Sequence, residues 1–211
     1  MRNETFFLLY HMDKFFGNVI LRRKKLAMRL STRLSMRLFK RRATLFVFIL
    51  VIFALKGYCQ PAKVVYKDSG FITAILQAHN NYRSVLQEPS LVWSADLAKD
   101  ALAWAQHLAS INKGEHDMSI RGHEGENLWW GTANSFSFTD MVGMWGNEKR
   151  SFKYDIYPNC TTKRSEVVGH YTQIVWKNTQ SVGCALAGNG QTDFLVCRYS
   201  PPGNIVGEKP Y

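Results

Sequence analysis

The segment GHYTQIVWKNT, residues 169–179, places a histidine where a protein can use it chemically. Gly169 and His170 directly precede a run of β-forming residues, Thr172 to Trp176, and a polar turn follows. An imidazole at the entrance of a strand can bind a metal ion, act as a general base, or lie buried and bonded to the backbone. The segment alone leaves these three roles open.

A second segment, GEHDMSIRGHEGENLWWG (residues 114–131), gathers acidic and imidazole side chains. It lacks a helical period and is predicted to be a loop, where functional groups are often presented. Further along the chain, Glu148 lies near the boundary of an apolar helix face and can point inward. The candidate residues of the segment itself are Glu115, His116, His123, Glu124 and Glu126.

The elements that must position these side chains follow from apolar spacing. It predicts helices over about 70–86, 94–111 and 139–152, and strands over 172–177, 182–187 and 192–199. Ser69 is placed to cap the first helix, and Ser137 with Asp140 has the pattern of a capping box at the third. Helices segregated from a hairpin-rich sheet indicate a layered α+β domain. His79 falls on the inner side of the first helix and is expected to bond that helix to the core.

Two apolar runs around Asn189-Gly190-Gln191 predict a hairpin that brings Cys184 and Cys197 together. A turn at Gly190-Gln191 sets the cysteines directly opposite, and a turn at Asn189-Gly190 sets them diagonally on one face. Either register predicts a disulfide, which contributes roughly 3 kcal/mol for a loop of this size. Cys59–Cys160 is a fallback pairing if Cys59 is retained.

The excess of positive over negative charge is confined to the N-terminal leader, residues 1–59. They hold 13 Lys and Arg against 2 Asp and Glu, whereas residues 60–211 hold 14 of each sign. The net charge of +11 is therefore no evidence that the folded part binds nucleic acid.

Within the leader, the uncharged run 43–55 follows three basic residues and suits the apolar region of a signal peptide. It is shorter than the roughly 20 apolar residues that span a bilayer. We predict cleavage before Gln60, with Met28 or Met36 as alternative starts, and a secreted or extracytoplasmic protein (periplasm or cell surface in a bacterium). An uncleaved signal anchor is the alternative, and it would be the chain's one link to a membrane.

Four segments resemble, in order and spacing, the signature motifs of the CAP superfamily: HNNYR (79–83), GENL (125–128), GHYTQIVWKNT (169–179) and FLVCRYSPPGNI (194–205). This superfamily comprises the cysteine-rich secretory proteins, antigen-five and the plant pathogenesis-related proteins. Residues 89–109 also resemble the second helix of the family. The resemblance covers about 70–211, after a short linker at 60–69, and implies a three-layer α-β-α sandwich.

The resemblance also implies two His and two Glu around a central cleft. The GHYTQ and GENL motifs assign His170 and Glu126, and a W-x-x-E pattern assigns Glu148. The remaining histidine is His116, with His123 as the runner-up.

Two neutral imidazoles can hold Zn²⁺ or another divalent cation and leave positions for water. A nearby Glu can orient a histidine, hold the water or accept its proton. This ligand set is smaller than the three protein ligands of catalytic zinc enzymes, so we expect weak binding. The structural alternative is that the His–Glu pairs join the loop to the sheet by charge-assisted hydrogen bonds.

We therefore expect an exported binding module with no assigned catalytic residue. The resemblance implies a lipid, sterol, glycan or extracellular protein as partner, and Trp129-Trp130 beside Gly131 offers a groove for an apolar ligand. The alternative is a metal- or Ser-assisted hydrolase, a peptidase, in the same cleft. Three serines lie near the site in sequence, but none has the G-x-S-x-G setting of a nucleophile: Ser119, Ser135 and Ser137.

Overall fold

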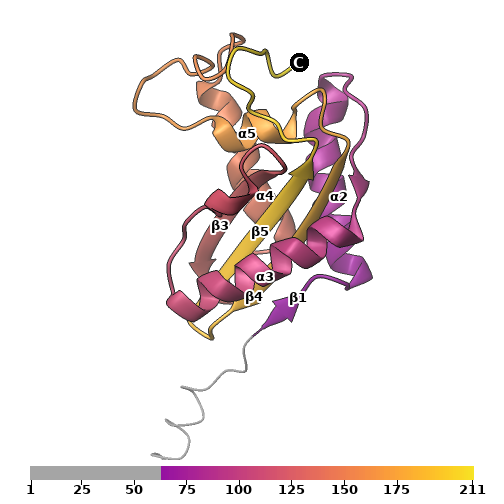
Figure 1. Cartoon of the computed structure of the whole chain (residues 1–211), viewed down its shortest axis with the longest axis vertical. Coiled ribbons are helices and arrows are strands. Elements are labelled where there is room, and N and C mark those ends of the chain that lie inside the picture. Colours follow the sequence, from indigo (N-terminus) through magenta and orange to yellow (C-terminus); the bar gives the residue numbers. More distant parts are fainter. Residues whose placement is uncertain (1–62) are drawn as a thin grey trace, which may run out of the picture. The chain divides into compact units, whose positions relative to one another are not determined.

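A computed structural model describes residues 63–211, which fold as one layered unit (Figure 1). The expected signal peptide, its cleavage site, the alternative starts and Cys59 lie outside the described residues.

A twisted sheet forms the middle layer. In space β4 pairs with β5 and β5 with β3, all antiparallel, and β3 lies at the edge. On the other side of β4, β1 pairs antiparallel and β2 pairs parallel. Part of the stretch expected to be a linker therefore belongs to the sheet. The strands are β1 Val64–Val65, β2 Val92–Trp93, β3 Gly125–Thr132, β4 Ser181–Gly188 and β5 Thr192–Ser200.

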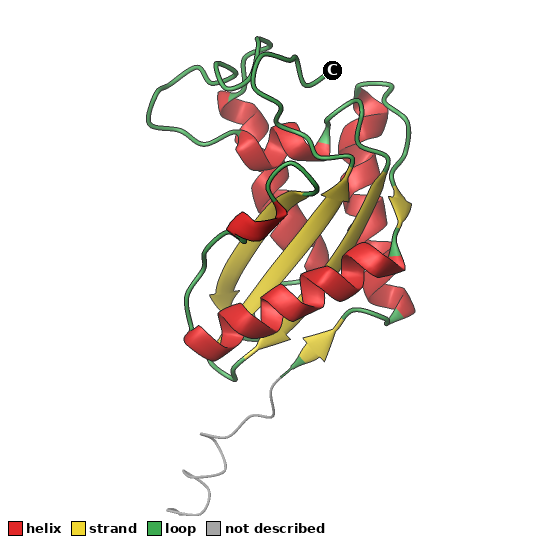
Figure 2. Ribbon diagram, in the orientation of Figure 1, coloured by secondary structure: helices red, strands yellow, loops and turns green. Residues whose placement is uncertain are grey.

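Helices cover both faces of this sheet. The helix α3 crosses one face, while α2 and α4 lie behind the other (Figures 1 and 2), which confirms the three-layer α-β-α sandwich. The helical segments are α2 Ser69–Val85, α3 Ala95–Ile111, η1 Met118–Ile120, α4 Phe138–Gly146, η2 Asn147–Ser151 and α5 Gly169–Ile174.

The alternation of side chains along β4 and β5 divides the core in two. Leu186 and Leu195 pack with α2 and α4, whereas Ala185 and Val196 pack with α3. Small residues on the α3 side let that helix lie close to the sheet. At Gly183 the approach is closest, because a Cβ there would meet the backbone of α3 near its first turn.

The ends of the helices follow local rules. Asp68, rather than the predicted Ser69, caps α2 by accepting a 2.8 Å hydrogen bond from the amide of Phe71. The predicted capping box of Ser137 and Asp140 is present at α4. The predicted third helix is shorter than expected, because α4 ends at Gly146 and the chain continues as the 3₁₀ helix η2.

The hairpin between β4 and β5 has the first of the two predicted registers. Asn189 and Thr192 flank the turn residues, and Cys184 pairs directly with Cys197, to which it is bonded by a disulfide. Cys160 is buried, donates its thiol proton to the carbonyl of Asp155, and forms no disulfide with any residue between 63 and 211.

The predicted strand over 172–177 is wrong, because its first half is the helix α5. The β-forming residues there are overridden by side-chain hydrogen bonds from elsewhere in the chain. Arg83, only 1% exposed, donates to the carbonyls of Ile174, Trp176 and Thr179, which have no strand partner. These bonds satisfy buried carbonyls at the C-terminal end of α5 and in the turn after it.

The prediction of a loop over 114–131 is also wrong in its second half. Gly125–Thr132 form β3, in which Glu126 lies opposite Arg198 of β5. Two glycines and a charged residue mask the alternation of this strand in the sequence.

His79 is buried and bonds α2 to the sheet, as predicted. Its Nδ1 donates to the carbonyl of Ile75 and its Nε2 accepts a 2.8 Å hydrogen bond from the hydroxyl of Tyr199. Burial lowers the pKa of His79 from 6.5 to about 4. The imidazole is therefore neutral in the folded protein.

A His79→Gln variant tests this assignment through the pH dependence of stability. Since the pKa of His79 is lower in the folded than in the unfolded chain, the unfolded chain binds more protons, and stability is lost as the pH falls. Between pH 7 and pH 5 we expect the wild type to lose about 2 kcal/mol of unfolding free energy more than the variant. Urea denaturation at each pH measures this difference, and parallel pH profiles would contradict the assignment.

Candidate functional site

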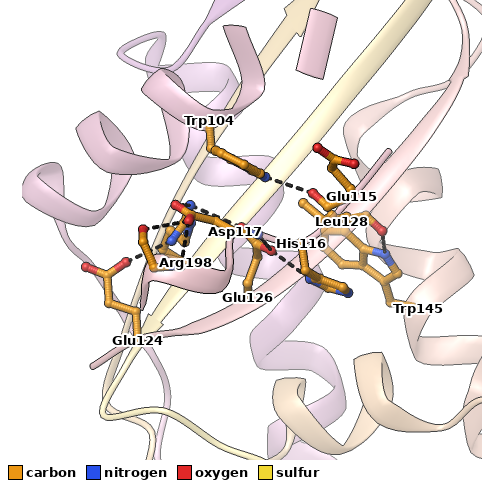
Figure 3. Close-up of polar contacts among 10 residues, drawn as sticks. Trp104, Glu115, His116, Asp117, Glu124, Glu126, Leu128, Trp145 and Arg198 are labelled. Atoms are coloured by element: carbon orange, nitrogen blue, oxygen red, sulfur yellow. Dashed lines mark hydrogen bonds and ion pairs between the residues drawn. The ribbon is translucent and has the colours of Figure 1, made fainter. Parts of the chain in front are cut away.

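His116 and Glu126 form the first of two histidine–carboxylate pairs. The Nδ1 of His116 lies 2.6 Å from Oε1 of Glu126, which also accepts a 3.1 Å hydrogen bond from the amide of Asp117. The imidazole side chain is 55% exposed, whereas the carboxylate is 4% exposed. A buried acceptor thus holds an imidazole that solvent can reach (Figure 3).

His170 and Glu148 form the second pair. The Nδ1 of His170 lies 2.6 Å from Oε1 of Glu148, and Oε2 accepts hydrogen bonds from the amides of His170 and Tyr171 at 3.0 and 3.1 Å. These amides belong to the first turn of α5, so Glu148 supplies acceptors that the helix itself lacks there. One carboxylate both orients the imidazole and stabilises the start of the helix that carries it.

Consecutive residues of β3 anchor both pairs. Glu126 binds His116, the side-chain amide of Asn127 donates to the carbonyl of His170, and the carbonyl of Leu128 accepts the indole proton of Trp145. The ring of Trp145 in turn stacks on His170, with ring centroids 6.0 Å apart. Glu126 and the Trp145–Leu128 bond are drawn in Figure 3.

Arg198 holds the carboxylates around the first pair. Its guanidinium lies 2.9 Å from Asp117, 3.1 Å from Oε2 of Glu126 and 3.5 Å from Glu124, and its side chain is 1% exposed. The Glu126 contact is an ion pair without hydrogen-bond geometry. The cluster joins the loop before β3 to the C-terminal part of β5.

The carboxylates around Arg198 titrate differently. Burial raises the pKa of Glu124, and the more distant contact with Arg198 offsets this only in part. Burial also acts to raise the pKa of Asp117, but hydrogen bonds from Ser119 and Arg198 outweigh it, so the pKa is lowered. Asp117 is therefore the more firmly ionised of the two.

Comparison with known proteins identifies the family. The family model that matches residues 76–199, more than half of the chain, is CAP, the cysteine-rich secretory protein family. The chain belongs to the CAP family.

Relatives of this CAP protein come from plants and animals. Pathogenesis-related protein 1C of Nicotiana tabacum is 37% identical over 137 residues, which are 64% of this chain and 78% of the relative. GLIPR1-like protein 1 of Homo sapiens is 35% identical over an alignment of 159 residues that covers 68% of this chain and 64% of the relative. The match thus spans slightly less than two thirds of the human protein.

Solved structures share the fold. The structure of BmVAL-1 has a TM-score of 0.59 at 23% identity and covers 68% of this chain and 82% of its own. The crystal structure of NaASP2 with Zn²⁺ has a TM-score of 0.57 at 21% identity and covers 68% of this chain and 86% of its own. At such identities the likeness extends to the backbone only.

Some residues that the sequence singled out lie apart from the two pairs. His123, the runner-up histidine, is exposed, and its side chain forms no hydrogen bond or ion pair with residues 63–211. Trp129 is 7% exposed and donates to the sulfur of Met144, whereas Trp130 is 55% exposed and lies over Gly114. As neighbours on a strand they face opposite sides of the sheet, so they do not line one groove.

The sequence analysis assigned no role to two residues that surround the His116–Glu126 pair. Arg198 lies in the apolar run FLVCRY, and a charged residue in a buried strand requires a carboxylate partner. Asp117 lies beside His116 but belongs to no motif. An arginine within an apolar run was the signal in the sequence that could have pointed to Arg198 and to a carboxylate partner such as Asp117.

Two hollows on the described surface lie away from the His–Glu pairs. One, of about 310 Å³, lies between β1 and the C-terminal half of α3, with Val64, Ala109 and Ala187 in its wall. The other, of about 690 Å³, borders residues 177–180. Within residues 63–211, no group of three or more His, Cys, Asp and Glu side chains is arranged to hold a metal ion. No helix in this range is long and apolar enough to cross a bilayer.

Replacing Glu148 with Ala tests its double role. The change removes the acceptor of two backbone amides and of the His170 ring, and we expect it to lower the free energy of unfolding by about 3 kcal/mol. Urea denaturation measures the loss, and hydrogen exchange of the His170 and Tyr171 amides localises it. Glu166→Ala, which removes an exposed carboxylate paired with Lys163, is the control and is expected to change stability by less than about 0.5 kcal/mol.

Proposed function

We propose that this CAP domain is an extracytoplasmic binding module that holds a divalent cation such as Zn²⁺ through Nε2 of His116 and His170. The observation that carries the proposal is the pair of histidine–carboxylate contacts, each 2.6 Å long and each made by Nδ1. Metal-binding histidines commonly donate one ring N–H to a carboxylate, which fixes the tautomer and leaves the other nitrogen free to bind. Among residues 63–211, neither Nε2 has a hydrogen-bond partner.

The donor set fits a weakly held ion. Two imidazoles are fewer than the three protein ligands of catalytic zinc sites, and the described residues offer no larger cluster. Water would complete the coordination of the ion, so exchange with the solvent is expected to be rapid. When bound, the cation supplies a Lewis acid and a positive charge that attracts an anionic group of a partner.

The similarity to NaASP2 also supports the proposal. Its crystal structure was solved with Zn²⁺, and it shares the fold of this chain. The organic or protein partner that we propose is a lipid, sterol, glycan or extracellular protein. We assign it no surface, because Trp129 and Trp130 do not form the groove expected from the sequence.

The contacts favour binding over hydrolysis. Both oxygens of Glu126 are engaged, one by His116 and the Asp117 amide and the other by Arg198, so this carboxylate is a poor general base. The nearby serines point their hydroxyls at local acceptors: Ser119 at Asp117, Ser135 at a backbone carbonyl and Ser137 at Asp140. None of these hydroxyls is paired with a histidine.

Calorimetric titration with Zn²⁺ tests the site in the purified full-length chain. We expect His170→Ala to weaken binding at least tenfold, because loss of a ligand costs no less than the roughly tenfold loss seen when only a ligand's supporting group is removed. His123→Ala is the matched control and should bind as the wild type does. Equal binding by His170→Ala contradicts the proposal. Metal-dependent peptide turnover that vanishes in Glu126→Gln would favour the hydrolase instead.

Export is tested by the mature N-terminus. We expect mass spectrometry of the protein from the medium or extracytoplasmic fraction to find a chain beginning at Gln60. A protein that retains the basic leader and stays in the membrane fraction contradicts cleavage and supports the signal anchor.

A further inference from the structure

The two carboxylates that hold the histidines are themselves held by different chemistry. Oε2 of Glu148 accepts two backbone amides at the start of α5, so local helix geometry fixes this side chain. Oε2 of Glu126 receives no backbone amide and instead faces the guanidinium of Arg198 at 3.1 Å. The His116 pair therefore relies on one remote side chain together with the amide of the adjacent Asp117, whereas the His170 pair relies on no remote cation.

Arg198 contacts the chain on both sides of the His116–Glu126 hydrogen bond. It sits directly across the β3–β5 ladder from Glu126, and it also binds Asp117, the neighbour of His116, at 2.9 Å. The amide of Asp117 donates to the same Glu126 oxygen that accepts from His116. One buried guanidinium thus fixes the acceptor and the backbone next to the donor at the same time.

Without this guanidinium, the amide of Asp117 is the one other donor described in residues 63–211 that holds the Glu126 carboxylate facing the His116 ring. The ring is 55% exposed, and Glu126 is its one hydrogen-bond partner in this range. Glu126 is 4% exposed and would bury a carboxylate with no opposing charge, so it would turn toward solvent. The imidazole would then lose its orientation along with its partner.

We propose that Arg198 is a positioning residue for His116: it holds Glu126 and Asp117 so that Nδ1 of the ring is engaged and Nε2 faces outward. The proposal concerns the geometry of the free protein, and its meaning for cation binding rests on the proposed function. The His170–Glu148 pair is predicted to be independent of Arg198 and serves as an internal reference.

A purely structural role for Arg198 predicts a different result. If the guanidinium only joined the loop to the sheet, its loss would lower stability without selectively changing the His116 ring. The ¹⁵N NMR signals of the histidine ring nitrogens separate the two roles, because they report which nitrogen of each ring carries the proton and whether it is hydrogen-bonded.

The experiment uses Arg198→Gln and Arg198→Lys in the full-length chain. Lys keeps the charge but has no planar fork with which to hold Asp117 and Glu126 together, so it tests geometry at constant charge. Lys153→Gln is the control, because it removes the same unit of charge from the exposed pair with Asp155. Where Arg198→Gln does not fold, Arg198→Lys carries the test.

In metal-free protein we expect the His116 ring signals of both variants to show a mixture of tautomers, while the His170 signals match the wild type. We expect Zn²⁺ affinity to fall by about tenfold in the variants and to stay unchanged in Lys153→Gln. Unchanged His116 signals in folded Arg198→Lys overturn the proposal, as do His116 and His170 signals that change together.

The two proposals fail separately. A wild type that binds no Zn²⁺ refutes the proposed cation site, and the metal-free NMR comparison still decides the role of Arg198. A wild type that binds Zn²⁺, together with variants that bind it equally well, refutes the role of Arg198 and leaves the cation site standing.

Discussion

The outer edge of β3 is the element on which the described site depends. An edge strand exposes backbone groups that need partners, and here the carbonyl of Leu128 accepts a hydrogen bond from the indole of Trp145 in α4. The side chain of Asn127 donates to the carbonyl of His170 in α5, and the side chain of Glu126 binds His116. Through these three bonds the strand joins α4 and α5 to the loop that carries His116.

Two buried arginines supply hydrogen bonds and ion pairs to acceptor groups in the irregular segments of this fold. Arg83 donates to carbonyls at the end of α5 and in the turn after it, and Arg198 binds Asp117 in the loop before β3 and Glu126 at the start of β3. Each is about 1% exposed, so each would be costly without its partners. The guanidinium suits both tasks because its donors point in several fixed directions in one plane. Long-range polar contacts therefore set the course of the loop that carries His116 and of the short helix that carries His170.

The sequence predicted those parts of the structure that local rules determine. The α3 helix, the capping box at Ser137 and the Cys184–Cys197 disulfide depend on residues close together in the chain. The helix α5 was not predictable in this way, since Glu148 and Arg83 stabilise it from a distance against its β-forming composition. The family resemblance supplied His116, Glu126, Glu148 and His170, which the structure brings together as two pairs. It did not supply Arg198, because no local pattern connects an arginine in one strand to carboxylates before another.

The double attachment of Glu148 has a consequence for evolution within the family. Its carboxylate supports the first turn of α5 as well as the imidazole of His170. Selection for a folded domain alone would therefore retain the acid, even in a descendant that has lost every ligand. An intact glutamate at this position is evidence that the scaffold is preserved, and only the two imidazoles can show whether cation binding has been kept.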